Sequence, residues 1–562
     1  MRRLFAILCC YVAASMVSVQ AQEPVALTGD IQAAAMPETK PEAMPENKPE
    51  TVASDSVETL LTKLTAVKLS KALPVLKKLE AQGGADLLPM FKSMLEGDLY
   101  FIKSSKAVIA VAKTDGKLTG RMVLDNQNLG LIEKKQIKKI RVNNKLRVFL
   151  RQAIARLQIS APEAELRILA VKTLLKSLNS DTVEILSSAR ASESDEDVRS
   201  MIDLALALHQ SASPLSETRY AAVVVLADSL EKEARNKLSE IAEQDSDKKV
   251  RVAAAKALKK INERIEFYDF IDQLFFGLSL GSVLLLAAIG LAITFGVMGV
   301  INMAHGEMIM LGAYTTYVVQ LMMPNAIEYS LWVAIPLAFV VSGLVGVMIE
   351  RGVIRHLHGR PLETLLATFG ISLILQQLVR SIFSPLNRQV ASPEWLSGSL
   401  EINPVLSLTL NRLYILAFAL LVFGLLLIIL RKTSLGLNVR AVSQNRDMAK
   451  AMGIKTGWVD AMTFGLGSGI AGIAGVALSQ LTNVGPNLGQ AYIIDSFMVV
   501  VFGGVGNLWG TLVAAFSLGI ANKFLEPVTG AVLASIFVLV FIILFIQKRP
   551  KGLFPQKGRA AE

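Results

Sequence analysis

Three polar side chains stand close together in an apolar stretch of the chain, at Asn302, His305 and Glu307. Glu307 is the only charged residue between Asp272 and Glu328. A carboxylate in a hydrocarbon core costs several kcal/mol unless it faces protein or water, so Glu307 needs a partner or a wet path. We consider two interpretations. In one, His305 and Glu307 pair with each other or with backbone and lock a break between helices. In the other, the three groups line a path and offer hydrogen bonds to a small polar solute.

The chain around these residues suggests how they are positioned. Re-entry into the membrane near Gly296–Asn302 starts a new helix, which Asn302 is expected to cap, and Glu307 lies near its positive dipole end. Gln376 and Gln377, in a later apolar run, are further candidates for the path. We expect no catalytic residue, metal site or cofactor. The four histidines show no metal-ligand spacing, and no phosphate-binding GxxxxGK[ST] loop or nucleophile elbow is present.

Eight uncharged runs predict an all-α polytopic membrane domain over 270–548, because about 20 apolar residues span a hydrocarbon core. The runs lie at 275–297, 301–323, 331–350, 362–384, 412–430, 459–481, 493–522 and 530–547. Basic residues cluster after the third, fifth and last runs, and the positive-inside rule makes all three clusters cytoplasmic. The amino-terminal domain is then periplasmic and the tail, 549–562, is cytoplasmic.

This orientation requires that the run at 493–522 makes no net crossing. Its centre, "FGGVGNLWG" (502–510), is rich in glycine, and we expect a re-entrant pair of half-helices there. A single long span is the alternative. In the preceding run, Gly465, Gly469, Gly472 and Gly475 share one helical face, which predicts close packing between helices.

The loop at 435–457 is too long merely to join two spans. A short amphipathic helix is expected from Arg440 to Met452, with Gly453 ending it. Such a helix either docks into a partner protein or lies on the lipid surface through its basic residues.

The amino-terminal half has a different composition. Residues 1–21 are expected to be a secretory signal, with an uncleaved anchor as the alternative, and both cysteines lie within it. Residues 22–55 carry two near-copies of a proline-and-charge octet and predict a disordered tether. The net charge of +11 lies largely in loops beside apolar runs, so it does not indicate nucleic-acid binding.

Residues 56–265 are expected to form a mainly helical domain. Aromatic and β-branched runs flank Asp115-Gly116, which predicts a small β-ribbon near 99–125. Four later segments share one plan, with an arginine opening a short Ala- and Leu-rich helix. A period of roughly 30 residues is typical of HEAT-like helical repeats. The repeated arginines, expected at solvated or capping positions, are Arg167, Arg199, Arg219 and Arg251.

Several motifs of the membrane half resemble a known family. They include "GLAITFGVMGVINMAHGEMIMLGAY", "TLLATFGISLILQQ", "GLNVRAVSQNRDMAKAMGI", "VFGGVGNLWGTLVAA" and "RPKGLF". Over most of 270–557 the chain is similar to permease subunits of ABC importers for branched-chain amino acids and urea. It looks most like the urea permease subunits of the UrtB type.

The resemblance implies a membrane permease that forms half of a path and is not an enzyme. The expected partners are a second homologous permease, two cytoplasmic ABC ATPases and a periplasmic binding protein, in the inner membrane of a bacterium. It also implies that the loop couples to an ATPase. The residues in the matching stretch are Arg440, Ala441, Asn445, Ala449 and Gly453.

The solute remains open at this point. Urea is the first expectation, because polar groups around Glu307 would suit a small neutral amide, and branched-chain amino acids are the alternative. An autonomous channel or secondary transporter is less favoured, because the membrane half shows no convincing internal repeat. A membrane-anchored scaffold would leave Glu307 unexplained.

Overall fold

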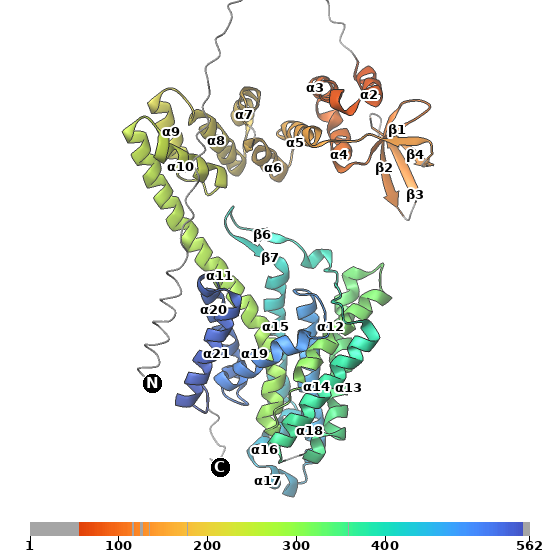
Figure 1. Ribbon diagram of the computed structural model, residues 1–562, viewed down its shortest axis with the longest axis vertical. Helices are drawn as coiled ribbons and strands as arrows, with labels where there is room; N and C mark the ends of the chain where they lie inside the picture. Colours follow the sequence, from red (N-terminus) through yellow and green to blue (C-terminus); the bar gives the residue numbers. More distant parts are fainter. Residues whose placement is uncertain are drawn as a thin grey trace, which may run out of the picture. The chain divides into compact units, whose positions relative to one another are not determined.

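A computed structural model describes residues 56–114, 117–123, 127–133, 135–176, 178–357 and 359–554. The expected signal (1–21), the expected tether (22–55), the Asp115-Gly116 turn and the end of the tail lie outside the described residues. Figure 1 shows helices throughout the described chain, with strands in two places.

The part of the chain before the membrane helices begins with short helices and a sheet. The helices are α2 (Val57–Ala66), α3 (Ala72–Gly83), α4 (Leu88–Glu96) and α5 (Asn144–Gln158). The sheet has five antiparallel strands in the order β4-β3-β2-β1-β5. They are β1 (Leu99–Ile102), β2 (Val108–Thr114), β3 (Lys117–Met122), β4 (Asn128–Leu131) and β5 (Ile137–Lys139). The pairing of Thr114 with Lys117 confirms the predicted hairpin, but the sheet is larger than the expected ribbon.

Five helices follow, namely α6 (Ala164–Leu175), α7 (Ser180–Ser192), α8 (Glu196–Gln210), α9 (Ser216–Leu226) and α10 (Lys232–Gln244). They share one apolar core with the first part of α11 (Lys248–Met298). The helix starts follow sequence signals: the side chains of Asn179 and Asp195 accept hydrogen bonds from backbone N–H groups of the first turns of α7 and α8.

Two of the repeated arginines make matching ion pairs. Arg167 donates two hydrogen bonds to Glu193, and Arg219 donates two to Asp245, each across 26 residues. The second arrangement repeats the first 52 residues later along the chain, and each arginine also binds two backbone carbonyls before its helix. Both arginines are therefore structural anchors and not solvated caps. The HEAT-like assignment itself stays a prediction.

The expected domain boundary near 265–270 lies inside one helix. α11 runs through 51 residues without interruption, which at 1.5 Å per residue is about 76 Å. Its first part packs with α9 and α10, and its second part belongs to the core of the membrane bundle.

The remaining membrane helices agree well with the predicted runs. They are α12 (His305–Met322), α13 (Ile327–Gly352), α14 (Pro361–Phe383), α15 (Leu410–Lys432), α18 (Thr456–Ser479), α19 (Leu488–Gly503), α20 (Leu508–Thr529) and α21 (Ala531–Lys548). Within the described residues, seven helices are long and apolar enough to cross a membrane, and these include neither α12 nor the 16-residue α19. The predicted polytopic helical architecture is confirmed. A short hairpin, β6 (Ser399–Glu401) with β7 (Ser407–Thr409), was not predicted.

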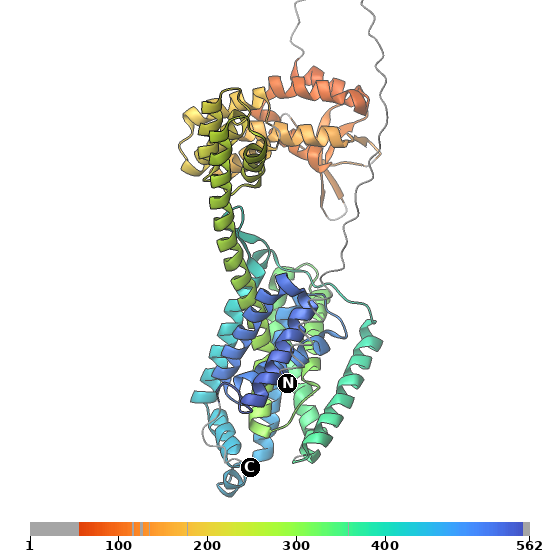
Figure 2. The same ribbon diagram turned by 60° about the vertical axis from the view of Figure 1, so that its left-hand side comes forward.

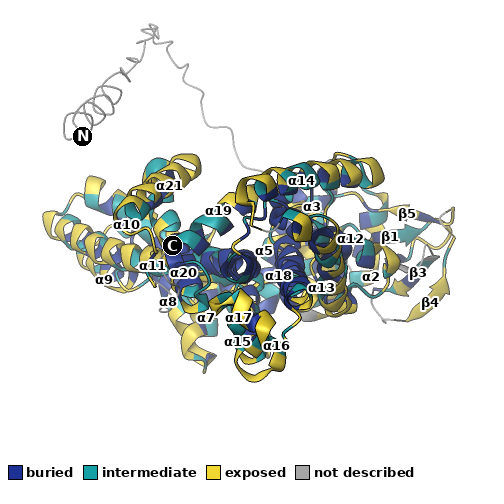
Figure 3. Cartoon of the chain, turned by 90° about the horizontal axis from the view of Figure 1, so that it is seen from below, coloured by how far each residue is buried: buried dark blue, intermediate teal, exposed yellow. Residues whose placement is uncertain are grey.

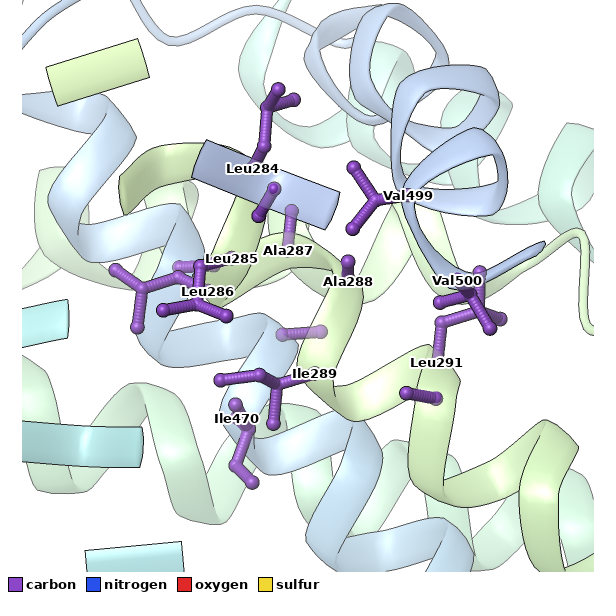
Figure 4. Packing of buried hydrophobic residues seen from close by; sticks show 14 of the residues in the cluster. Leu284, Leu285, Leu286, Ala287, Ala288, Ile289, Leu291, Ile470, Val499 and Val500 are labelled. Atoms are coloured by element: carbon purple, nitrogen blue, oxygen red, sulfur yellow. The ribbon is translucent and has the colours of Figure 1, made fainter. Parts of the chain in front are cut away.

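The core of the bundle is built around α11 and α18. In both helices 83% of the most apolar 18 residues are buried, against 17% in α21, and Figure 3 shows α18 mostly in the buried colour. Figure 4 shows Ile289 of α11 beside Ile470 of α18, and Val499 and Val500 of α19 on the side of Ala288 and Leu291. The predicted glycine face of α18 is confirmed, because a methyl group at Gly472 would meet Ala338 and Ser342 of α13, and one at Gly475 would meet Ile309 of α12.

The run at 493–522 does break at its glycines. α19 ends at Gly503, and Gly504 and Gly506 adopt the left-handed backbone conformation (φ 107° and 78°). The break packs against the tail, where Leu553 and Phe554 donate backbone hydrogen bonds to carbonyls of Phe502 and Gly503. The expectation of two half-helices was wrong in one respect: α20 has 22 residues and is itself long enough to span.

Candidate functional site

The site begins where the chain leaves α11 and enters α12. Gly299 ends α11 in the left-handed conformation (φ 67°), and residues 300–304 form an irregular connection. Asn302 is buried in this connection, and its Oδ1 accepts a hydrogen bond from Ala304 N at 3.0 Å. Asn302 therefore holds the connection three residues before α12 begins. The expectation that it caps the helix was wrong, because Ala304 occupies the cap position.

Glu307 lies in the first turn of α12 and is buried. One carboxylate oxygen, Oε1, accepts hydrogen bonds from Ser372 Oγ at 2.9 Å and from Gln376 Nε2 at 2.7 Å, both on α14. The other oxygen, Oε2, is also buried and has no hydrogen-bond partner among the described residues. A buried acceptor without a partner is costly, which makes this oxygen the strongest candidate for contact with a solute or water.

His305 faces in another direction. Its Nε2 lies 2.9 Å from the carbonyl oxygen of Ala287 on α11, and this acceptor requires that Nε2 carry the proton. Its ring also sits where a side chain at Gly290 would collide with it. His305 thus joins α12 to a backbone carbonyl of α11. This agrees with the interpretation in which His305 or Glu307 binds backbone and locks the break between the helices. It forms no pair with Glu307.

The two candidate glutamines separate in the structure. Gln376 is buried and binds Glu307, whereas Gln377 is exposed and lies on another face of α14. Figure 2 shows α14, drawn in teal-green, at the edge of the bundle, and only 28% of its most apolar residues are buried. The structure therefore brings Asn302, His305, Glu307 and Gln376 into the same region and leaves Gln377 out.

Two residues of this site were missed from sequence. Thr368 Oγ1 accepts a hydrogen bond from Met303 N at 3.2 Å, and Ser372 binds Glu307. A signal was present, because polar residues recur at every fourth position of α14 and so share one helical face. The face consists of Thr364, Thr368, Ser372, Gln376 and Arg380. Arg380, at its end, donates a hydrogen bond to Asn487 Oδ1 at 2.7 Å, just before α19.

These groups can recognise a small polar molecule. The free oxygen of Glu307 accepts hydrogen bonds from an ammonium or amide N–H, while the Arg380 guanidinium, one turn beyond Gln376, donates to anionic oxygen. They offer no nucleophile activated by a base.

The expected coupling segment contains two helices and not one. α16 (Ser434–Gln444) and α17 (Arg446–Ala451) meet at Asn445, whose side chain caps α17 by accepting a hydrogen bond from Met448 N at 2.9 Å. Gly453 ends the segment in the left-handed conformation (φ 87°).

The five expected coupling residues do not share an outward face. Ala449 is buried with Val439, Val442 and Val459, and the Arg440 guanidinium donates to the backbone carbonyl of Leu430. Ala441 is half-buried, whereas Asn445 and Gly453 are exposed. The large apolar residues that face outward are Leu437 on α16, 61% exposed, with Met448, 60% exposed, and Met452, 77% exposed, in and directly after α17.

An ion pair that sequence did not predict ties α17 to α18. Arg446 donates hydrogen bonds to both carboxylate oxygens of Asp460, which is buried. The pair fixes the start of α17 on the helix that also forms the centre of the bundle.

Comparison with known proteins agrees with this architecture. Residues 273–546 match the family model described as "Branched-chain amino acid transport system / permease component". The chain is 30% identical over 299 residues to the high-affinity branched-chain amino acid transport system permease protein BraD of Pseudomonas aeruginosa, covering 51% of this chain and 96% of the relative. This chain belongs to the branched-chain amino acid transport permease family.

Other members of this permease family show similar likeness. The permease protein LivH of Escherichia coli is 30% identical over 300 residues, covering 51% of this chain and 96% of the relative. A probable branched-chain amino acid transport permease of Methanocaldococcus jannaschii is 28% identical over 249 residues, or 43% of this chain and 77% of the relative. No solved structure matches the chain. The family and the apolar helices make the chain a multi-pass membrane permease.

Proposed function

We propose that this permease is the membrane subunit of an ATP-driven importer and that its solute is a branched-chain amino acid. The observation that carries the proposal is the buried carboxylate of Glu307, of which one oxygen is held by α14 and the other is free. A free amino acid is a zwitterion. Its ammonium group matches the Glu307 oxygen, and its carboxylate matches Arg380 at the end of the same polar face.

Urea, the first expectation from sequence, is the second candidate. Urea has hydrogen-bond donors and acceptors but no charge, so it would use Gln376 and Ser372 as well as Glu307. The matched relatives are named for branched-chain amino acids, and the site contains charged groups of both signs. These two points favour an amino acid over urea.

The proposal includes an orientation and partners. Basic residues follow the ends of α13, α15 and α21, which favours a cytoplasmic location for these ends and a periplasmic one for residues 56–265. We place α16 and α17 against a cytoplasmic ATPase, with Met448 and Met452 as the docking surface. A second homologous permease completes the path, and a periplasmic binding protein delivers the solute.

Uptake of labelled leucine and labelled urea, by cells with and without this chain, tests the proposed solute. We expect leucine uptake to fall when the chain is absent and urea uptake to stay unchanged. Loss of urea uptake alone would reverse the order of the two candidates.

A further inference from the structure

A basic hollow lies between the end of α13 and the start of α18. Its volume is about 480 Å³, and it is lined by Arg351, Arg355, Lys455, Gly457 and Trp458. Arg351 belongs to the last turn of α13, Arg355 to the following 3-10 turn η3 (Ile354–Leu357), and Trp458 to the first turn of α18. The Arg351 guanidinium lies 5.9 Å from the centre of the Trp458 ring, so the two helices approach each other here.

The charge of the hollow is mostly uncompensated. Among the described residues, neither Arg355 nor Lys455 has an ion-pair or side-chain hydrogen-bond partner, and both are exposed. Arg351 lies 3.7 Å from Glu350, which is buried behind it. The next carboxylate, Asp460, is already held by both arms of Arg446. Three cations thus face one open space with one buried carboxylate beside them.

The hollow also has room for an anion. Gly457 provides no side chain, and a methyl group there would lie 3.9 Å from Arg355 Nη2. Guanidinium groups donate paired hydrogen bonds to phosphate oxygens, and a lysine adds a compact positive charge. Phosphate is therefore the chemistry that these residues fit best.

Apolar residues next to the hollow indicate the source of the phosphate. Met348 lies one turn before Arg351 and is 63% exposed, and Leu344, one further turn along the same face, is 59% exposed. On α18, Met462 lies one turn after Trp458 and is 37% exposed. A soluble phosphate would leave these exposed apolar side chains in contact with solvent, whereas the acyl chains of a lipid would cover them. Tryptophan is also the residue favoured at a membrane–water interface.

We propose that this hollow binds the phosphate headgroup of an anionic phospholipid, whose acyl chains lie along Met348 and Met462. Arg351, Arg355 and Lys455 hold the phosphodiester, and the Trp458 ring lies at the level of the headgroup. Basic pockets between membrane helices are a recurrent form of lipid recognition. The inference depends on the membrane location of the family and not on the proposed solute.

Native mass spectrometry of the purified full chain tests this inference. The protein in detergent is mixed with equal amounts of phosphatidylglycerol and phosphatidylcholine, and bound lipids are counted. We expect a preference for phosphatidylglycerol that falls about tenfold in the double variant Arg355→Gln/Lys455→Gln, because two headgroup cations are lost. The matched control is Arg431→Gln/Lys432→Gln, which removes two basic residues at the end of α15 and should keep the preference.

Two further variants separate binding from folding. Gly457→Leu fills the hollow but retains all three cations, so it should also lower the preference, while Arg355→Lys/Lys455→Arg keeps the charge and should preserve most of it. Equal binding of the two lipids by the parent protein would overturn the proposal. Displacement of phosphatidylglycerol by millimolar inorganic phosphate would overturn the lipid assignment in favour of a soluble phosphate.

Discussion

Gln376 donates a hydrogen bond of 2.7 Å to Oε1 of Glu307 and so joins α14 to the first turn of α12. This contact orients the carboxylate and leaves its second oxygen without a partner among the described residues. α14 is otherwise an edge helix with a mostly exposed surface. The polar contact therefore positions both α14 and the group that we propose to meet the solute.

Replacement of Glu307 should depend on the hydrogen-bonding ability of the new residue. Glu307→Gln keeps an acceptor for Ser372 and retains part of the uptake, whereas Glu307→Leu leaves Ser372 and Gln376 without their acceptor. The unsatisfied groups cost about 1–3 kcal/mol, so we expect uptake by the leucine variant to fall by about tenfold or more. Initial uptake rates, normalised to folded protein in the membrane, check this prediction. Parental rates in both variants would exclude Glu307 from the path.

Neighbouring glutamines on α14 provide a matched comparison. Gln376→Leu removes the donor to Glu307 and should lower uptake, whereas Gln377→Leu changes an exposed residue and should leave it near the parental rate. The measurement is the concentration dependence of uptake for both variants. Equal losses in the two variants would show that the glutamines act through general packing of α14 and not through Glu307.

Sequence identified Glu307 and Gln376 but not their arrangement. The apolar runs fix where helices lie, because length and hydropathy are local properties. The orientation of α14 about its own axis decides whether Gln376 or Gln377 faces α12. That orientation is set by contacts between residues distant in sequence. The recurrence of Thr368, Ser372 and Gln376 at every fourth position was the available signal.

The coupling segment shows the same limit. Its amphipathic pattern was evident from the sequence. Because the pattern continues across Asn445, it predicted one helix where the structure has two, α16 and α17. An asparagine can cap a new helix, and only the direction of the chain after it shows that it does so here. Ala449 was expected on the docking surface. It is buried because the chain changes direction at Asn445, where α17 begins.

The docking surface on α17 can be tested with a matched pair of methionines. Met452 and Met322 are both 77% exposed, but Met322 lies at the end of α12, away from α16 and α17 in sequence and structure. Met452→Asp should weaken co-purification of the ATPase by about tenfold, because a carboxylate would become buried without a partner. Met322→Asp should leave co-purification unchanged. Normal ATPase binding by Met452→Asp would contradict the docking assignment.

The ion pair of Arg219 and Asp245 predicts a pH dependence outside the membrane. The Arg219 guanidinium donates hydrogen bonds to Asp245 and holds the pKa of that carboxyl below its usual value, although burial opposes the effect. The stabilisation is thus present above the unfolded pKa of about 3.9 and is lost as the pH falls through the lower folded value. Thermal unfolding of the full chain, followed by circular dichroism, should show a falling midpoint below about pH 4.

Two aspartate variants check that assignment. Asp245→Asn should lower the unfolding midpoint near neutral pH and flatten the acid dependence, because the half-buried Arg219 loses its charged partner. Asp228→Asn breaks an exposed pair with Lys260 and should change stability little. An acid dependence that is identical in the parent and in Asp245→Asn would remove Asp245 as its source.

Transport by the assembled complex tests the central claim most directly. The chain, a second permease, the ATPases and the binding protein are reconstituted in proteoliposomes, and accumulation of labelled leucine is followed with and without ATP. We predict ATP-dependent accumulation of leucine that excess unlabelled isoleucine suppresses and excess urea does not. ATP-dependent accumulation of labelled urea without accumulation of leucine would contradict the account.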